Sequence, residues 1–153
     1  MSKHFVDSNV FYYHFLQDEV QGPISTEIIQ RIKRGESATT SVIVISELIS
    51  LFEFRILQSK KRKDISSVER EYIIEQFDKS VINFQKLLDN LVHLEKVSCT
   101  FEDARRAFLL MPQYNLGYND CVNLSIIERE KIKNIYSFDK DFDRVPWLSR
   151  KNS

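Results

Sequence analysis

Glycine and proline are scarce in this sequence, with three of each among 153 residues. Because these residues punctuate turns and loops, their scarcity predicts long helices and strands joined by short connections. A hydrophobic fraction of 42% and a charged fraction of 29% exclude a disordered chain and are typical of a globular protein. The length suits one hydrophobic core, so we expect a single domain over residues 1–153.

An excess of one charge, a metal-binding cysteine pattern and a long apolar run are also missing. Lys+Arg and Asp+Glu both total 22, which argues against binding nucleic acid through overall positive charge but leaves a local basic patch open. Cys99 and Cys121 have no metal-binding spacing and are expected to be reduced thiols. No apolar run approaches the ~20 residues of a membrane span, and the N-terminus has no secretory apolar segment. We therefore expect a cytoplasmic protein with no membrane partner.

Apolar periodicity predicts strands that alternate with helices along the chain. Apolar or β-branched runs predict strands at 3–6, 39–45, 93–98 and 134–138. Helical spacing predicts helices at 9–16, 24–32, 48–57, 68–91, 101–111 and 119–127. This order predicts an α/β three-layer sandwich, with a mostly parallel central sheet flanked by helices.

Two of the predicted helices begin with capping signals. Ser66 and Glu69 form the S-x-x-E pattern of a capping box before the helix at 68–91, whose apolar face begins with Val68 and Tyr72. Thr100 is placed to cap the next helix. The apolar residues of that helix are Phe101, Ala104, Phe108 and Met111.

Four acidic residues are expected at one edge of the sheet. Asp7 and Asp139 directly follow predicted strands, while Glu47 and Asp120 lie near the first turns of helices. In a parallel sheet, helix starts and the carboxyl ends of strands face the same edge, where such folds carry their sites. The four side chains are therefore predicted to converge.

Convergence of these carboxylates would be costly without a compensating charge. Two carboxylates ~5 Å apart repel by roughly 3 kcal/mol at an effective dielectric constant of ~20, and a whole domain is stable by only about 5–15 kcal/mol. Either the side chains splay apart, or protons or a cation neutralise them. Oxygen ligands without histidine or cysteine suit Mg²⁺ or Mn²⁺ and disfavour zinc.

The same acids lie in four segments that resemble the motifs of PIN domains. The segments are FVDSNVF at 5–11, SVIVISEL at 41–48, YNDCVNLSI at 118–126 and IYSFDKDFD at 135–143. They occur in the family's order and span nearly the whole chain. PIN domains are metal-dependent ribonucleases, and many small members are toxins of toxin–antitoxin pairs of the VapC type. The resemblance implies a Mg²⁺- or Mn²⁺-dependent endoribonuclease that hydrolyses RNA phosphodiesters, with a small antitoxin protein and a second copy of itself as partners.

The resemblance also implies roles for individual residues. The catalytic and metal-site acids that it implies are Asp7, Glu47, Asp120 and Asp139. Asp143 or Asp141 would supplement them, and Asn9 and Ser137 match polar positions beside them. The helix that carries Glu47 would start near Val42, whereas β propensity alone extends the preceding strand to residue 45.

Several readings remain open at this point. The KKRK run of Lys60, Lys61, Arg62 and Lys63 is either a solvated turn or a contact to RNA phosphates. An RNA-processing PIN nuclease without an antitoxin would carry the same acids, whereas the presence of all four argues against a catalytically inactive PIN fold that binds other molecules. An aspartate-based phosphotransfer domain is disfavoured, because the position two residues after Asp7 is asparagine.

Overall fold

The computed structural model describes residues 2–153, and in this range it contains one five-stranded sheet. The strands are β1 (His4–Val6), β2 (Ala38–Ser41), β3 (Leu94–Val97), β4 (Asn134–Tyr136) and β5 (Ser149–Lys151). Their order is β3-β2-β1-β4-β5, and every neighbouring pair is parallel. Phe5 of the central strand lies opposite Thr39 on one side and Ile135 on the other. The predicted parallel sheet is confirmed.

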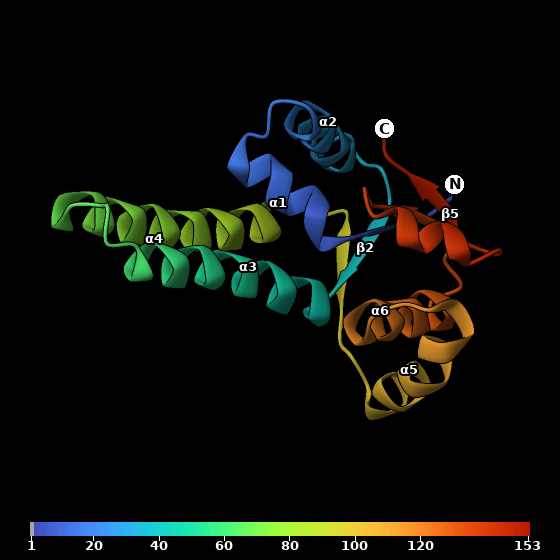
Figure 1. The fold of residues 1–153 in the computed structure, drawn as a ribbon. Coiled ribbons are helices and arrows are strands. Elements are labelled where there is room, and N and C mark those ends of the chain that lie inside the picture. Colours follow the sequence, from blue (N-terminus) through green and yellow to red (C-terminus); the bar gives the residue numbers. More distant parts are fainter. Residues whose placement is uncertain (1) are drawn as a thin grey trace.

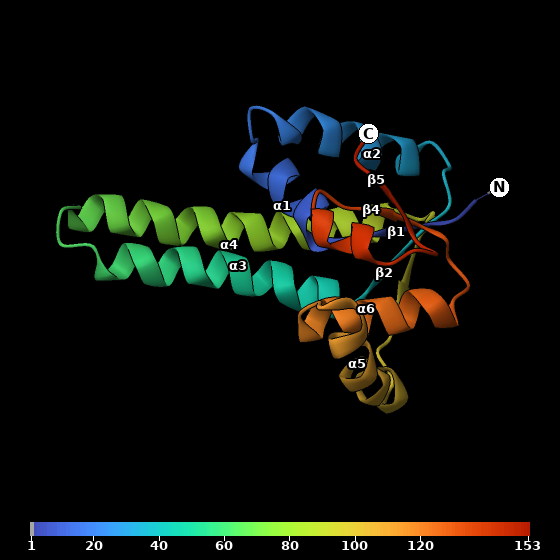
Figure 2. The ribbon, with the colours of Figure 1, turned by 45° about the vertical axis from the view of Figure 1, so that its right-hand side comes forward.

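Six α-helices and one short 3-10 helix connect the strands within residues 2–153. They are α1 (Ser8–Leu16), α2 (Gln21–Lys33), α3 (Val42–Lys61), α4 (Ser67–Asn90), α5 (Phe101–Tyr114), α6 (Tyr118–Arg129) and η1 (Lys140–Arg144). Figures 1 and 2 show α1 and α2 on one face of the sheet and α5 and α6 on the opposite face. None of the described helices combines the length and apolar character that crossing a bilayer requires. The architecture is the predicted three-layer sandwich.

The helices α3 and α4 form a long hairpin that extends well beyond the sheet (Figures 1 and 2). A helix of 20 residues such as α3 is about 30 Å long, whereas β2 before it has only four residues. Close to the sheet the hairpin is buried through Phe52 and Phe84. Farther out, the apolar face of α4 is open to solvent, with Val68 73% and Tyr72 61% exposed. Only the inner part of the hairpin therefore contributes to the core.

The start of α3 differs from the prediction based on β propensity. β2 ends at Ser41 and α3 begins at Val42, so the prediction of a strand up to residue 45 is wrong beyond residue 41. The helix start that the family resemblance implies is confirmed. Ser41 explains the change, because its hydroxyl accepts a hydrogen bond from the Val44 nitrogen at 3.3 Å and caps the first turn. This cap and the burial of Val44 outweigh the β propensity of the segment.

The inward face of α5 differs from the apolar pattern in its sequence. The residues that α5 buries are Asp103, Ala107 and Leu110. Phe101 and Phe108, by contrast, are 79% and 64% exposed. Arg129 on α6 donates hydrogen bonds to both carboxylate oxygens of Asp103, at 3.1 and 2.9 Å, so an ion pair orients this helix. The side of α5 that faces the protein therefore carries an ion pair as well as apolar contacts.

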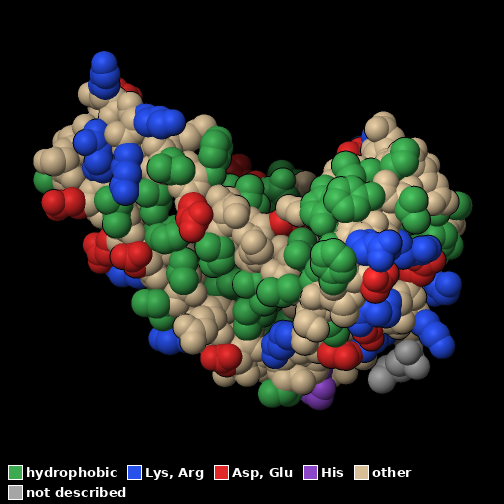
Figure 3. Space-filling model, turned by 90° about the horizontal axis from the view of Figure 1, so that it is seen from below, with side chains coloured by type: hydrophobic (Ala, Val, Ile, Leu, Met, Phe, Trp, Pro, Cys, Tyr) green, Lys and Arg blue, Asp and Glu red, His purple; other side chains and the backbone are tan. Residues whose placement is uncertain are grey.

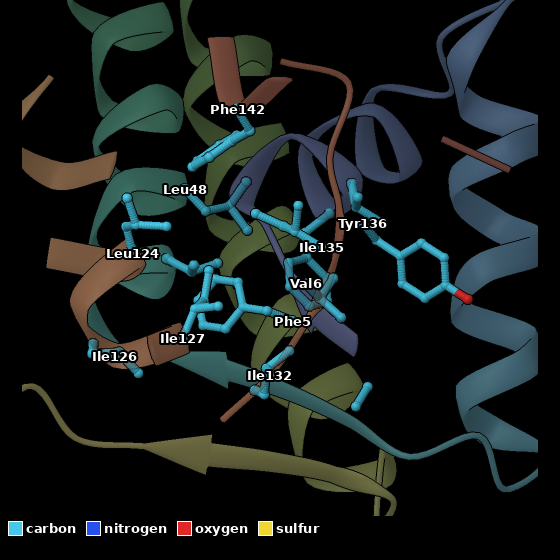
Figure 4. Packing of buried hydrophobic residues seen from close by; sticks show 14 of the residues in the cluster. Phe5, Val6, Leu48, Leu124, Ile126, Ile127, Ile132, Ile135, Tyr136 and Phe142 are labelled. Carbon is cyan, nitrogen blue, oxygen red and sulfur yellow. The ribbon is translucent and has the colours of Figure 1, made fainter. Parts of the chain in front are cut away.

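The hydrophobic core reaches the edge of the sheet where the acidic residues lie. Figure 4 shows Phe5 of β1 among the side chains that α6 places on the sheet. Leu48 and Phe142 point into the same end of the core, and both are fully buried. Leu48 directly follows Glu47, and Phe142 lies three residues after Asp139. Because a packed core leaves little freedom, these two anchors fix the backbone that carries both acids.

Candidate active site

Asp7 is the most deeply buried of the four predicted acids, with 4% of the residue exposed. It follows β1 and caps α1, since one carboxylate oxygen accepts a hydrogen bond from the Ser8 nitrogen at 2.8 Å. The other oxygen accepts bonds from the Ser137 hydroxyl at 2.7 Å and the Asn9 amide at 3.2 Å. Burial raises the pKa of Asp7, the hydrogen bonds from Ser137 and Ser8 lower it, and the charge of Asp139 raises it again. The side chain is rigidly held in surroundings that disfavour its charge.

Asn9 and Ser137 connect the end of β4 to the start of α1. The amide nitrogen of Asn9 donates to the Ser137 hydroxyl at 3.1 Å, and its oxygen accepts from the Phe138 nitrogen at 3.2 Å. The Ser137 hydroxyl also accepts from the Asp139 nitrogen at 3.1 Å. The two polar residues therefore hold the strand ends that carry Asp7 and Asp139 in a fixed relation.

Glu47 and Asp120 reach the same edge from helices. Glu47 lies in the second turn of α3, and Asp120 lies in the first turn of α6. The pKa of each is raised to about 7, first by burial and then by the negative charge of Asp7. Asp120 further raises the pKa of Glu47, and Asp139 further raises that of Asp120. The structure thus places each of the four carboxylates within electrostatic range of at least two others. Asp7, Glu47, Asp120 and Asp139 are called the acid cluster below.

Asp141 and Asp143 differ in their relation to the acid cluster. The charge of Asp141 raises the pKa of Asp120, although Arg144 also forms an ion pair with Asp141 at 2.9 Å. Asp143 accepts two hydrogen bonds from the Arg150 guanidinium, at 2.9 and 3.0 Å, and these bonds lower its pKa. Of the two residues considered as supplements, Asp141 lies within reach of the cluster and Asp143 is paired with an arginine.

Three residues for which no role was predicted, Ser41, Asn123 and Arg150, support the acid cluster. The Ser41 hydroxyl donates to the Asn123 side-chain oxygen at 2.6 Å, and both residues are fully buried. Asn123 lies one turn after Asp120, so this bond ties the start of α3 to α6. A serine directly before an apolar helical pattern is a capping signal, so the sequence could have identified Ser41 as the cap of α3. Arg150, on β5, donates a hydrogen bond to the Ser137 carbonyl oxygen at 3.3 Å. No local sequence pattern predicts that contact.

The donor chemistry of the acid cluster fits a hard divalent cation. Within residues 2–153, no three His, Cys, Asp or Glu side chains lie close enough together to enclose a metal ion. Carboxylates without a counterion repel one another, and Mg²⁺ keeps several of its waters and needs only one or two direct carboxylate contacts. The pKa values raised to about 7 mark negative charge that such an ion would stabilise. The residues therefore suit Mg²⁺ or Mn²⁺ held partly through water.

The basic run lies at the far end of the hairpin, away from the acid cluster. It consists of Lys60, Lys61, Arg62 and Lys63, at the end of α3 and the start of the turn. At 1.5 Å per residue, Lys61 is about 21 Å along the helix from Glu47. Arg62 pairs with Asp64 at 2.7 Å. Figure 3 shows Lys and Arg side chains gathered at the outer end of the hairpin.

Comparison of sequences relates the chain to one family. A sequence model described as "PIN domain" matches residues 4–148. A curated relative named Ribonuclease VapC2, from Methanocaldococcus jannaschii, is 28% identical over 152 residues. The alignment covers 96% of this chain and 91% of the relative, so the likeness spans both proteins almost completely.

Solved structures with a similar fold cover nearly the whole chain. VapC20 from Mycobacterium tuberculosis, described as a Sarcin-Ricin loop cleaving toxin, matches with a TM-score of 0.64 and 14% identity, over 96% of this chain and 97% of that one. VapBC2 from Rickettsia felis, bound to a DNA fragment from their promoter, matches with a TM-score of 0.60 and 17% identity, over 97% of each chain. A toxin–antitoxin complex from Klebsiella pneumoniae matches with a TM-score of 0.62 and 13% identity, over 98% of each chain. At these identities the likeness concerns the fold.

Proposed function

The chain belongs to the PIN domain family, and from this premise we propose that it is a divalent-metal-dependent endoribonuclease that hydrolyses RNA phosphodiesters. The relative named Ribonuclease VapC2 supports the reaction. The similarity of the fold to a toxin–antitoxin complex supports the further proposal that the chain is the toxin of a type II pair. The family assignment also removes the reason to consider an aspartate-based phosphotransfer domain.

The observation that carries the proposal is the acid cluster itself. Its carboxylates come from the segments after β1 and β4 and from α3 and α6, and the pKa values of Asp7, Glu47 and Asp120 are raised by burial and by neighbouring carboxylates. Such an arrangement opposes folding unless protons or a bound cation neutralise the negative charge. We assign the binding of Mg²⁺ or Mn²⁺ to Asp7, Glu47, Asp120 and Asp139. When bound, the cation would polarise a phosphate oxygen and lower the pKa of a coordinated water.

The side chains divide the work according to their surroundings. Asp7 is held by three hydrogen bonds, so it would bind the cation at a fixed position and thereby position the scissile phosphate. Glu47 and Asp120 have pKa values of about 7 without the ion; a bound cation would favour their charged forms, so that they hold the ion or orient its waters. Asn9 and Ser137 would keep Asp7 and Asp139 in register without touching the substrate.

The outer surface of α5 supports the proposal of a protein partner. Phe101, Phe108 and Leu109 are 79%, 64% and 69% exposed, and the Phe108 ring lies 5.5 Å from that of Tyr118. Exposed apolar patches of this kind mark contacts with other proteins. We assign this surface to a second copy of the chain. An antitoxin segment that covered the acid cluster would keep the toxin inactive in the cytoplasm.

Cleavage of total RNA with and without Mn²⁺, followed by mapping of the cut ends, tests the proposed function. The parent protein should cut RNA only when Mg²⁺ or Mn²⁺ is present. Asp7→Asn should abolish cleavage while keeping the fold, because asparagine can also cap α1 and hydrogen-bond Ser137. An Asp7→Asn protein that cuts at the parent rate would refute the assignment of the acids. A parent that never cuts RNA would leave the inactive binding fold as the better explanation.

A further inference from the structure

A cavity of about 460 Å³ opens directly beside the acid cluster, between α3 and the start of α6. It shares Glu47 with that cluster and includes Ser8 next to Asp7, and Leu51 and Phe54 of α3 form its apolar part. Phe54 is 56% exposed and Leu51 is 37% exposed. Figure 3 shows a hollow between the hairpin and the lobe of α5 and α6, with hydrophobic side chains on both sides. An open apolar pocket that continues from a catalytic edge is a candidate for substrate binding.

Helical geometry places the apolar part of the pocket at a defined distance from the acids. Glu47, Leu51 and Phe54 are spaced by four and three residues, so they lie on one face of α3. At 1.5 Å per residue, Phe54 is about 10 Å along the helix from Glu47. A substrate group that packs on Phe54 would therefore be a neighbour of the phosphate that reacts at the acid cluster, and would not be that phosphate itself.

The polar lining of the pocket selects for an uncharged group. Ser46, Ser50 and Asn119 contribute hydroxyl and amide groups, which both donate and accept hydrogen bonds. The lining contains the carboxylate of Glu47 and includes no lysine or arginine. Apart from the cation proposed at the acid cluster, the lining offers a phosphate no positive charge. A flat, uncharged group with an apolar face and a polar edge matches both the apolar and the polar residues of the lining.

We propose that this pocket binds an unpaired nucleobase of the RNA substrate, from a nucleotide next to the scissile phosphate. Phe54 stacks on the face of the base, and Ser46, Ser50 and Asn119 hydrogen-bond its edge. A base inside a duplex offers neither its face nor its pairing edge, so the pocket selects single-stranded segments and loops. The inference rests on the proposed ribonuclease function and adds the residues that bind the nucleotide next to the cut.

Cleavage of a single-stranded oligonucleotide and of matched copies with one abasic position tests this pocket. Stacking on an aromatic side chain contributes about 1–3 kcal/mol per base, which corresponds to about 5- to 150-fold in kcat/KM. Phe54→Ala and Phe54→Leu should each lose a factor in this range, whereas Phe54→Trp should keep the parent rate. Tyr72→Ala is the matched control, because Tyr72 is an exposed aromatic residue that lines a separate pocket on the hairpin.

The abasic substrates separate base binding from other roles of Phe54. One abasic position beside the cut site should slow the parent by the same factor that Phe54→Ala loses on intact RNA, and it should slow Phe54→Ala hardly at all. Equal sensitivity of both proteins to every abasic position would overturn the proposal. So would a Phe54→Ala protein that cuts intact RNA like the parent, or one that changes only the oligomeric state in sedimentation, which would assign the pocket to a second copy. If the parent cuts no RNA at all, the proposed function has failed before this inference is tested.

Discussion

Replacing Glu47 by glutamine should stabilise the protein at pH 8 when no divalent ion is bound. The pKa of Glu47 rises from 4.5 to about 7 on folding, mainly because the carboxyl group is buried. The folded state therefore binds this proton more tightly than the unfolded chain does. The resulting stability is fully present below pH 4.5 and is lost as the pH rises through 7. Glutamine has the same shape and no charge, so it avoids this loss.

The size of the effect follows from the change in pKa. The interval from 4.5 to about 7 corresponds to roughly 3 kcal/mol at 1.36 kcal/mol per pH unit. Glu47 is partly open to solvent and shares the effect with Asp7 and Asp120, so we expect about 1–2 kcal/mol. For a chain of this size, that gain raises the melting temperature by about 2–8 °C.

Thermal unfolding in the presence of EDTA, at pH 8 and at pH 5, measures this difference. Glu47→Gln should melt above the parent at pH 8 and by much less at pH 5. Glu53→Gln is the matched control, because Glu53 is an exposed glutamate on the same helix, and it should melt with the parent at both pH values. A Glu47→Gln protein that melts at or below the parent temperature at pH 8 would refute the reasoning, as would an equal gain at both pH values.

Three further predictions concern the metal, the support of the acid cluster and the basic run. Millimolar Mg²⁺ should raise the melting temperature of the parent more at pH 8 than at pH 5, because protons compete for the carboxylates at low pH; an equal rise at both would count against a carboxylate site. Ser41→Ala should destabilise the protein by about 1–3 kcal/mol in urea unfolding, because the buried Asn123 oxygen loses the bond from Ser41; a change below 0.5 kcal/mol would show that the pair is not needed. Replacing Lys60, Lys61 and Lys63 together by glutamine should lower the salt dependence of single-stranded RNA binding, reducing the slope of log K against log salt by about 2; an unchanged slope would identify the run as a solvated turn.

Much of the fold could be predicted from the sequence, because the signals are local. Ser66 and Glu69 form the predicted capping box, with both reciprocal hydrogen bonds present at the start of α4. The alternation of strands and helices is enough to place Asp7 and Asp139 at strand ends. Parallel pairing then brings the helix starts to the same edge. The order of strands and helices predicts this parallel topology, and the topology in turn brings the acids together.

The remaining features depend on contacts between distant residues. The β-branched residues after Ser41 are helical because a cap and burial outweigh their propensity for strands. β5 has only three residues, and no periodic pattern can define so short a strand. The sequence offers both Asp141 and Asp143, and only the structure shows that Asp143 is held by Arg150 on β5 whereas the charge of Asp141 raises the pKa of Asp120. The exposure of Phe101 likewise depends on how α5 packs on α6, which the apolar pattern of α5 alone does not show.

Calorimetric titration of Mn²⁺ at pH 7.5, into the parent and into Asp7→Asn, tests the central claim most directly. Four carboxylates gathered at one edge of the sheet should give the parent a saturable site for one or two ions. The Asp7→Asn protein should bind the ion much more weakly while it melts as cooperatively as the parent. A parent that shows only heats of dilution, or an Asp7→Asn protein that binds equally well, would contradict the claim that the acid cluster is a metal site.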